Sequence, residues 1–298
     1  MSTHPGFEGF ELSSVDVGEV SLRVRVGGSG PPLLLLHGYP ETHQMWGPVA
    51  ADLARDFTVV APDLRGYGGS SQPATVPGHE TFGKRAMAAD GVALMRGLGF
   101  DRFDVAGHDR GARVAYRMAL DSPDAVRRVT VMDVVPTGEV WARADARFVL
   151  GYWHWAFLAQ PEPLPETVIG ADPVRFFLDL QFGRRLRDVV APEALADYAR
   201  ALSDPAVVHA VCEDYRAGAT CDRQLDDEDR AAGRTIAAPL QVLWGATGAL
   251  PAWYDPLEVW RPWADDVVGS ALDCGHFVVE EQPAATLAAL RAFHTAGR

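Results

Sequence analysis

The sequence predicts an α/β protein with a mostly parallel, doubly wound sheet into which a helical segment is inserted. Three observations carry this prediction. The chain of 298 residues, 48% hydrophobic and 22% charged, has the composition of an ordinary globular protein. Short runs rich in valine and leucine alternate with helical patterns along most of its length. This alternation stops in the middle of the chain and then resumes.

Six short apolar runs are candidates for buried strands. Continuous apolar runs of this kind, separated by helices, are typical of parallel strands that are covered on both faces. Helical patterns at 84–99 and 112–120 lie between them, which favours a doubly wound sheet. The runs are PPLLLLHG, FTVVAPDLRG, FDVAGHD, VTVMDVV, LQVLWGATG and the weaker DVVGSALDCGH.

The alternation breaks after VMDVVPTG, and no clear buried strand follows until about residue 235. This stretch contains aromatic and Leu/Ala-rich helical patterns, interrupted by QPEPLPE and SDPA. We therefore expect residues 1–135 and 236–298 to form one core and residues 136–235 to form a helical cap. An independent second domain is the alternative, but the return of strand patterns favours an insertion.

Composition restricts the partners. The net charge of −13 and the pI of about 5.1 argue against nucleic acid or an anionic membrane as a partner. The three cysteines and nine histidines follow no metal-binding or redox spacing, so we expect no metal and a reducing, cytoplasmic compartment. No secretory signal and no apolar run of about 18 residues is apparent. An anionic substrate would need a local positive charge.

The segment GHDRG places Asp109 between two glycines. A strand-like FDVA precedes it and a helix-like ARVAYRMAL follows it. This is the pattern of a nucleophile elbow, a turn so tight that residues two positions from the nucleophile must be small. The pattern therefore predicts that Asp109 projects from the end of a strand, above the first turn of a helix.

An aspartate at this position indicates a particular chemistry. A carboxylate that attacks a saturated carbon forms an ester, which water can cleave, whereas a serine would form a stable ether. Asp109 therefore points to displacement of a halide or an epoxide oxygen, followed by hydrolysis of the ester.

Ester hydrolysis needs a base and an oxyanion site. His276 in LDCGHF is the expected base, and Asp133 in VMDVV is the expected carboxylate that orients it, with Asp255 as the rival acid. The backbone N–H groups of Tyr39, in HGYP, and of Arg110 are the expected oxyanion donors.

Taken together, these motifs resemble the α/β-hydrolase fold and, more closely, the fluoroacetate (haloacetate) dehalogenases. The resemblance covers nearly the whole chain. It implies hydrolysis of a 2-haloacetate to glycolate and halide without a cofactor, in a homodimer. The motifs that carry it are HGYPETHQMW, PDLRGYGGS, KRAMA, GHDRGARVAYRMALDSP, HWAFLAQP, CEDYRAGA and CGH.

The resemblance also implies roles for site residues. Asp109 would be the nucleophile, His276 the base and Asp133 its partner, while Arg110 and Arg113 would hold the substrate carboxylate. The spacing agrees, because the two arginines fall three apart at the start of a helix and share a face. Two guanidinium groups suit a carboxylate and would keep Asp109 ionised.

The halide pocket is implied to consist of His154, Trp155 and Tyr215, which offer N–H and O–H donors. Fluoride is a poor leaving group, so several donors around one point would suit its departure. Neighbouring Tyr152 and Trp153 are expected to serve packing.

Three further positions bear on the pocket and its surroundings. Gly151 and Ala249 are small where the resemblance suggests larger side chains, so a larger 2-haloacid is an open alternative. Cys274, close to the expected base, is interpreted as an inert buried thiol.

Two other functions remain open at this point. An epoxide hydrolase would share the elbow and use tyrosine acids, Tyr215 with Tyr152 or Tyr198, although the arginine pair argues against it. A non-catalytic receptor on the same fold would not need a complete set of Asp109, Asp133 and His276.

Overall fold

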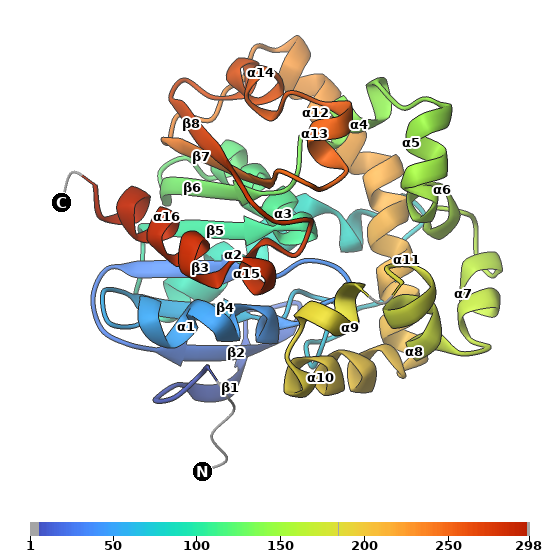
Figure 1. The fold of residues 1–298 in the computed structure, drawn as a ribbon, viewed down its shortest axis with the longest axis horizontal. Helices are drawn as coiled ribbons and strands as arrows, with labels where there is room; N and C mark the ends of the chain where they lie inside the picture. The colour runs from blue at the N-terminus through green and yellow to red at the C-terminus, as the bar shows by residue number, and fades with distance from the viewer. Residues whose placement is uncertain (1–5, 184, 297–298) are drawn as a thin grey trace.

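A computed structural model describes residues 6–183 and 185–296. Within these residues, the chain forms one eight-stranded sheet in the order β1-β2-β4-β3-β5-β6-β7-β8 (Figure 1). The strands from β4 to β8 are parallel, whereas β1 and β2 are antiparallel to each other and β2 is antiparallel to β4. The strands are β1 (Glu11–Asp16), β2 (Ser21–Gly27), β3 (Pro32–Leu36), β4 (Thr58–Pro62), β5 (Phe103–His108), β6 (Val126–Met132), β7 (Leu240–Gly245) and β8 (Val267–Leu272).

The six predicted runs correspond to strands β3 through β8, so the predicted fold class is confirmed. The prediction that all six are buried is wrong for β8, which is an edge strand with mostly exposed residues. Strands β3 and β5 are buried along their whole length, which explains their continuous apolar sequence. The sequence interpretation missed β1 and β2. In β1 exposed and half-buried residues alternate, and in β2 buried residues are interspersed with half-buried ones. Neither strand therefore contains the continuous apolar run that is typical of a buried strand.

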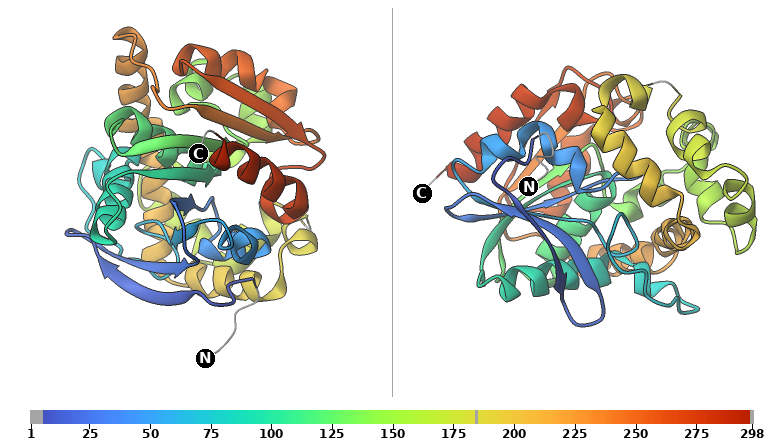
Figure 2. Two further views of the ribbon diagram at one scale, coloured as in Figure 1. Left: turned by 90° about the vertical axis from the view of Figure 1, so that its left-hand side faces the viewer. Right: turned by 90° about the horizontal axis from the view of Figure 1, so that it is seen from below.

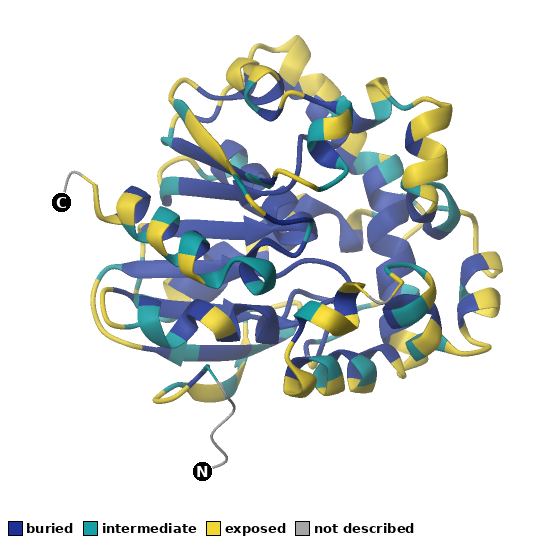
Figure 3. Cartoon of the chain, viewed as in Figure 1, coloured by how far each residue is buried: buried dark blue, intermediate teal, exposed yellow. Residues whose placement is uncertain are grey.

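Helices cover both faces of the sheet. Helices α1 (Gly47–Leu53) and α16 (Pro283–Thr295) pack together on one face, while α2 (Lys84–Gly97) and α3 (Asp109–Asp121) pack on the other (Figures 1 and 2). Figure 3 shows the central strands of the sheet in dark blue, as buried, whereas the edge strands β1 and β8 are largely exposed. The helices predicted at 84–99 and 112–120 correspond to α2 and α3.

Between β6 and β7 the described residues form helices and no strand. This segment lies at the end of the sheet toward which the β5 arrow points (Figure 1). Its elements are α4 (Thr137–Ala142), α5 (Ala146–Gly151), α6 (Trp153–Leu158), α7 (Leu164–Ile169), α8 (Pro173–Arg175), η3 (Phe176–Leu180), α9 (Arg185–Val189), α10 (Pro192–Leu202), α11 (Pro205–Ala219) and α12 (Cys221–Ala231).

Helix α11 is the longest of these elements, and its start follows from local sequence. Asp204 caps it, because its side chain accepts the Ala206 N–H at 2.9 Å, and Pro205 occupies the first turn, where no N–H is needed. Most of its residues are buried, and it packs against α6, α7 and α12.

The remaining helical elements are short. They are η1 (His43–Trp46), η2 (Glu80–Phe82), α13 (Leu250–Trp253), α14 (Pro256–Trp260), η4 (Arg261–Trp263) and α15 (Val278–Glu281). In the part of the chain that the structure describes, no helix combines the length and apolar character that a bilayer crossing requires.

Candidate active site

The predicted elbow is present at the junction of β5 and α3. Asp109 has a φ of +46°, a left-handed conformation that is costly for a residue with a side chain. Both flanking glycines are sterically required. A Cβ on Gly107 would lie 2.4 Å from the Gly111 carbonyl oxygen, and one on Gly111 would lie 2.4 Å from the Leu36 carbonyl oxygen. The turn therefore forces the Asp109 carboxylate away from the sheet.

His276 links the two predicted carboxylates. Its Nδ1 lies 2.6 Å from Asp133 Oδ2, and its Nε2 lies 3.9 Å from Asp109 Oδ2. Asp133 follows β6 directly, and its Oδ1 accepts the Gly245 N–H at 3.0 Å. The rival acid Asp255 lies elsewhere: it is exposed and caps α14 by accepting the Glu258 N–H.

The two oxygens of Asp109 have different surroundings. Oδ1 accepts the backbone N–H of Tyr39 at 3.0 Å, whereas Oδ2 is the oxygen nearest His276. The N–H of Tyr39, one of the two expected oxyanion donors, therefore already donates to the Asp109 carboxylate. Arg110, the other expected donor, is the second residue of α3.

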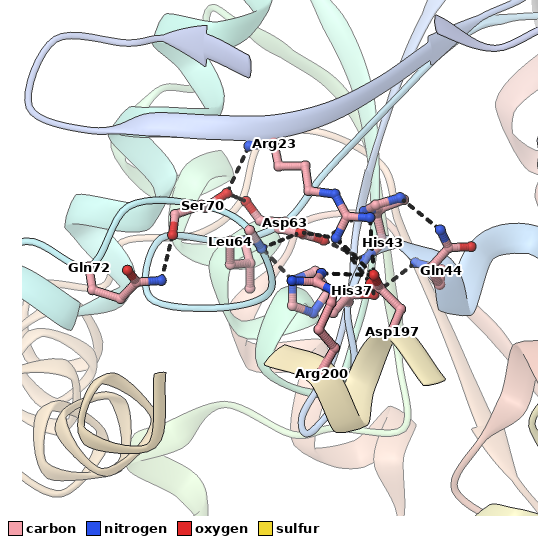
Figure 4. A network of polar contacts seen from close by, with 12 residues as sticks. Arg23, His37, His43, Gln44, Asp63, Leu64, Ser70, Gln72, Asp197 and Arg200 are labelled. Atoms are coloured by element: carbon pink, nitrogen blue, oxygen red, sulfur yellow. Dashed lines mark hydrogen bonds and ion pairs between the residues drawn. The ribbon is translucent and has the colours of Figure 1, made fainter. Parts of the chain in front are cut away.

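The loop that carries Tyr39 is held by a buried polar network (Figure 4). Asp63 Oδ1 accepts the His43 N–H at 2.9 Å and lies 2.7 Å from His43 Nδ1. His37 Nε2 accepts the Leu64 N–H at 2.9 Å. Because both histidines belong to the HGYPETH segment, these contacts fix the loop between β3 and α1 relative to the end of β4.

The same network reaches the inserted helices. Asp197 of α10 lies 3.1 Å from the Arg23 guanidinium and accepts the Thr42 hydroxyl at 2.8 Å. Asp63 and Arg23 form an ion pair at 3.3 Å. Burial alone would raise the pKa of Asp63, but His43, His37 and Arg23 lower it below its ordinary value, so the network retains a negative charge at its centre.

The side chains around Asp109 keep its carboxyl ionised. Burial alone would raise its pKa, but His276, His108, Arg110 and Arg113 together lower the pKa below the ordinary value. An ionised carboxylate is the form that a nucleophile requires.

A cavity of about 240 Å³ opens above Asp109. It brings together the predicted nucleophile, base, base partner, oxyanion residue and halide-pocket residues, and of the two arginines it includes Arg113. Its lining residues are Tyr39, Asp109, Arg113, Asp133, Val140, Phe148, Tyr152, His154, Trp155, Gln181, Phe182, Arg185, Tyr215, Gly248, Ala249, Leu250, Tyr254, His276 and Phe277.

Arg110 does not belong to this lining. Its Nε lies 2.9 Å from Asp214 Oδ2, and its Nη2 donates to the Asp214 carbonyl oxygen at 2.7 Å. Lys84 contacts the same carboxylate. The Arg110 guanidinium stacks 4.4 Å from the Tyr215 ring centre, and among the described residues its buried Nη1 has no acceptor. The two arginines of the predicted pair therefore differ: Arg110 is paired with Asp214 outside the cavity lining, whereas Arg113 lines the cavity.

Arg113 lies on the wall of the cavity. Its Nη1 donates to the Val135 carbonyl oxygen at 2.9 Å and to Thr137 Oγ1 at 3.1 Å, and its guanidinium lies 4.7 Å from the Trp155 ring centre. Its Nε is buried and has no acceptor within the described part of the chain. A carboxylate in the cavity would meet this positive charge.

The expected halide donors come from two inserted helices, His154 and Trp155 from α6 and Tyr215 from α11. Across residues 6–183 and 185–296, none of these side chains forms a hydrogen bond with a protein acceptor, so all three are available to a ligand. The His154 ring stacks on Tyr39, with the ring centres 6.1 Å apart. Burial lowers the pKa of His154 to about 3, so its imidazole is neutral at physiological pH.

Four further positions named from the sequence differ in whether they line the cavity. Tyr152 lines the cavity, so it is not only a packing residue, whereas Trp153 is 37% exposed. Tyr198, the other candidate acid, is buried outside the cavity lining. Gly151 also lies outside the lining, because the Trp253 ring fills the space that its side chain would occupy.

Ala249 and Cys274 are the two remaining positions that the sequence singled out. Ala249 lines the cavity directly, so its small size does enlarge it. Cys274 is buried and free, and burial raises the pKa of its thiol to about 12, consistent with an inert thiol.

Sequence reasoning missed a group of acids behind His276. His108 Nε2 lies 2.7 Å from the His276 carbonyl oxygen, and its Nδ1 lies 3.2 Å from Glu41 Oε2. Burial raises the pKa of Glu41 to about 7 and that of nearby Glu280 well above its ordinary range. No motif identifies this pair, because it joins a loop after β3 to α15.

Other missed residues, Gln181, Arg185 and Tyr254, line the cavity but lie in segments without a recognisable pattern. Only their three-dimensional placement reveals them. No group of three or more potential metal-ligating side chains is found within the described ranges, so no metal centre can be assigned there.

Comparisons with known proteins agree with this geometry. A family model of the alpha/beta hydrolase fold matches residues 31–283. The chain is 47% identical to a fluoroacetate dehalogenase from Burkholderia sp, over 96% of this chain and 94% of that protein. It is 34% identical to a soluble epoxide hydrolase from Corynebacterium sp. (strain C12), over 86% and 87% of the two chains.

A solved structure extends the comparison to three dimensions. The crystal structure of ALR0039 from Nostoc sp PCC 7120 superimposes with a TM-score of 0.92 at 47% identity, over 97% of this chain and 99% of that one. The elbow and the family match together establish a hydrolase. The chain therefore belongs to the α/β hydrolases, in the family that includes the fluoroacetate dehalogenases.

Proposed function

We propose that this enzyme is a hydrolytic dehalogenase that converts a 2-haloacetate, such as fluoroacetate or chloroacetate, to glycolate and halide. The observation that carries the proposal is one cavity that is lined by Asp109, by the His276–Asp133 pair next to it and by Arg113. The 47% identity to a fluoroacetate dehalogenase supports the same reaction.

In the first step, Asp109 Oδ2 attacks the carbon that bears the halogen, and the carbon–halogen bond breaks on the opposite side. Oδ2 is the oxygen for this attack because Oδ1 is held by the Tyr39 N–H. The product is an ester between Asp109 and the substrate carbon, together with a halide ion.

In the second step, His276 removes a proton from water, which attacks Asp109 Cγ. Negative charge then develops on Oδ1, where the Tyr39 N–H already donates, and the Arg110 N–H is proposed as the second donor. Asp133 orients the imidazole and stabilises its protonated form. Collapse of this intermediate releases glycolate and restores Asp109.

The substrate carboxylate is proposed to bind Arg113, with Arg110 behind it. Arg113 presents its charge on the cavity wall, while Arg110 is held in place by Asp214 and retains a free Nη1. This local positive charge resolves how a chain with a net charge of −13 attracts an anion.

The halide is proposed to leave toward His154, Trp155 and Tyr215. A neutral His154 can donate one N–H, Trp155 another and Tyr215 an O–H. Donors that strengthen as negative charge develops lower the barrier to departure of a poor leaving group. We propose that residues 136–235 act as a cap over a core of residues 1–135 and 236–298, and exclude bulk water during this step.

Epoxide hydrolysis is the second candidate, and one observation favours it. Tyr152 and Tyr215 both line the cavity, so two phenols are placed near Asp109. Burial raises the pKa of both phenols, and that of Tyr215 lies well above the ordinary value. Both phenols therefore stay protonated and can act as acids. A neutral epoxide would, however, leave the Arg113 charge on the wall without a partner.

The two reactions are distinguished by halide release, measured by ion chromatography from fluoroacetate and chloroacetate, with a neutral epoxide as control. Halide from either acid is the expected result. Diol from the epoxide with no halide from either acid would overturn the proposal. Bound haloacetate without turnover of any substrate would instead indicate a non-catalytic receptor.

A homodimer is proposed on the exposed face of the inserted helices. Helices α5, α6, α7 and η3 of this segment carry apolar side chains that are at least 37% exposed: Val149, Leu150, Trp153, Leu164, Val168 and Leu180. Much of the backbone of α5 and α7 is coloured yellow, as exposed, in Figure 3. A cytoplasmic location is proposed with it. Analytical ultracentrifugation of the intact chain tests the dimer, and a monomer at micromolar concentration would contradict it.

A further inference from the structure

The loop that carries His276 is held by a carboxylate from the helix that follows it. This loop lies between β8 and α15, and Glu281 is the last residue of α15. Glu281 Oε2 accepts the Gly275 N–H at 2.7 Å, and its Oε1 accepts the Phe277 N–H at 3.1 Å. The two oxygens of one side chain therefore bind the backbone immediately before and immediately after the base.

These hydrogen bonds act on the backbone, so they fix the place from which the imidazole extends. The His276 carbonyl oxygen is held as well, by His108 Nε2 at 2.7 Å and by the Val278 N–H at 2.9 Å. Hydrogen bonds to an ionised carboxylate are stronger than those between neutral groups. Removal of the Glu281 carboxylate would leave two N–H groups without their acceptor, and the loop would relax on both sides of the base.

The inserted helices contact the same carboxylate. Arg185 begins α9 and its Nη2 lies 3.1 Å from Glu281 Oε2, so α9 and α15 meet here although the two residues are 96 positions apart (Figure 1). A Cβ on Gly275 would overlap the Arg185 guanidinium, so this group lies directly on the backbone next to His276. The Glu281 side chain is only 13% exposed. A carboxylate that accepts from two N–H groups and one guanidinium has little freedom to move.

The base takes part in only one of the two chemical steps of the proposed function. Ester formation needs the Asp109 carboxylate and the halide donors, whereas ester hydrolysis needs His276 to take a proton from water. A displacement of a catalytic group by about 1 Å can cost roughly a hundredfold in rate. The position of the His276 loop should therefore affect the second step and leave the first unchanged.

We propose that Glu281 is a positioning residue for His276, and thus for ester hydrolysis, and that Arg185 orients its carboxylate from the inserted segment. The inference rests on the proposed function, because it assigns a residue to the second step of that reaction. It also gives the inserted helices a part in water activation, in addition to their part in halide departure.

The test separates the two steps. Enzyme is mixed with excess chloroacetate and quenched at successive times, and chloride and protein-bound ester are measured in each sample, which gives a rate constant for each step. In Glu281→Ala we expect ester hydrolysis to slow at least about tenfold and ester formation to change less than about twofold, because only the base is displaced. The ester should therefore accumulate on a larger fraction of sites than in the wild type.

Two milder variants grade the effect. Glu281→Gln keeps one acceptor oxygen, so its rate constant for ester hydrolysis should lie between those of the wild type and Glu281→Ala. Arg185→Gln should slow the same step by a smaller factor than Glu281→Ala, because both N–H groups keep their acceptor.

Glu258→Ala and Arg187→Gln are the matched controls. Glu258 is an exposed glutamate that pairs with Arg261, and Arg187 lies on α9 with a 45% exposed side chain that pairs with Asp179. Each control therefore breaks one glutamate or arginine ion pair, as the test variants do. Both rate constants in the controls should equal those of the wild type.

Equal slowing of both steps in Glu281→Ala, or unchanged rate constants with fewer active sites, would indicate a purely structural role and overturn the inference while leaving the proposed function intact. If the wild type forms no ester from chloroacetate, the proposed function fails instead. The low-field proton NMR signal of the His276–Asp133 hydrogen bond then replaces kinetics. Glu281→Ala should shift or broaden this signal and Glu258→Ala should not, and an unchanged signal in Glu281→Ala would overturn the inference.

Discussion

The site is built from two halves that are held in different ways. The half from the sheet comprises Asp109, Asp133, His276 and the Tyr39 N–H. Each lies just beyond the carboxyl end of a strand and is fixed by backbone geometry and short hydrogen bonds. The half from the inserted helices comprises His154, Trp155 and Tyr215, which are fixed by ring packing and have free donors. The difference suggests that the first half performs the bond-making steps and the second tunes the leaving group.

Replacing the nucleophile should have the largest effect. Asp109→Asn removes the attacking oxygen, so we expect halide release to fall on the order of 10⁴- to 10⁶-fold. Ion chromatography over long incubations measures this loss. Asp133→Asn should also lower the rate strongly, whereas Asp255→Asn, at the exposed cap of α14, should not. Equal losses at positions 133 and 255 would contradict the assignment of the base partner.

Changes in the inserted half should be graded and should depend on the halogen. His154→Asn should lower kcat/KM for fluoroacetate by about 10²-fold and for chloroacetate by less, because fluoride needs more help from donors. Since burial lowers the pKa of His154 to about 3, its neutral form is present at every pH from 5 to 9. The ratio of wild-type to variant kcat/KM should therefore be flat across this range. A ratio that changes tenfold between pH 5 and 8 would show that His154 titrates.

The charge on the cavity wall should act on binding. Arg113→Gln should raise KM for chloroacetate about 10- to 100-fold, the range expected for losing a charged hydrogen bond. Arg113→Lys keeps the charge but not the planar group, so its KM should lie between that of the wild type and that of Arg113→Gln. An unchanged KM in Arg113→Gln would mean that the carboxylate binds elsewhere, with Arg110 as the next candidate.

The smallest effect is expected for Glu41, which lies behind His276, and it concerns the stability of the fold. Glu41 has a pKa of about 7 in the folded protein, so between about pH 4.5 and 7 the folded state keeps a proton that the unfolded chain has released. Stability therefore falls as the pH rises through this window. Glu41→Gln cannot ionise, so its melting temperature should exceed that of the wild type by about 2–4 °C at pH 8.

This stability difference should shrink toward pH 5, where both proteins are uncharged at position 41 when folded. Thermal unfolding followed by circular dichroism at the two pH values measures it. A gain of equal size at pH 5 and pH 8 would mean that ionisation of Glu41 is not the cause.

The sequence predicts the half of the site from the sheet better than the half from the inserted helices. Asp109 is identifiable because the turn around it admits only small neighbours. Strands β3 through β7 are identifiable because buried strands need continuous apolar runs, whereas β8 is exposed and its sequence pattern is weaker. His154, Trp155 and Tyr215 carry no such local constraint, since aromatic residues on helices usually serve packing, and only the family resemblance assigned them. Gln181 and the Glu41–Glu280 pair depend on segments that meet only in the folded chain, so no local pattern could predict them.

The central claim is that Asp109 forms an ester that His276 helps to hydrolyse, and one mass measurement tests it most directly. His276→Asn, incubated with fluoroacetate, should release about one fluoride per site and gain the mass of one carboxymethyl group, located on the peptide that contains Asp109. The double variant with Asp109→Asn should gain none. Continued turnover by His276→Asn without any adduct, or an adduct on another peptide, would contradict the account.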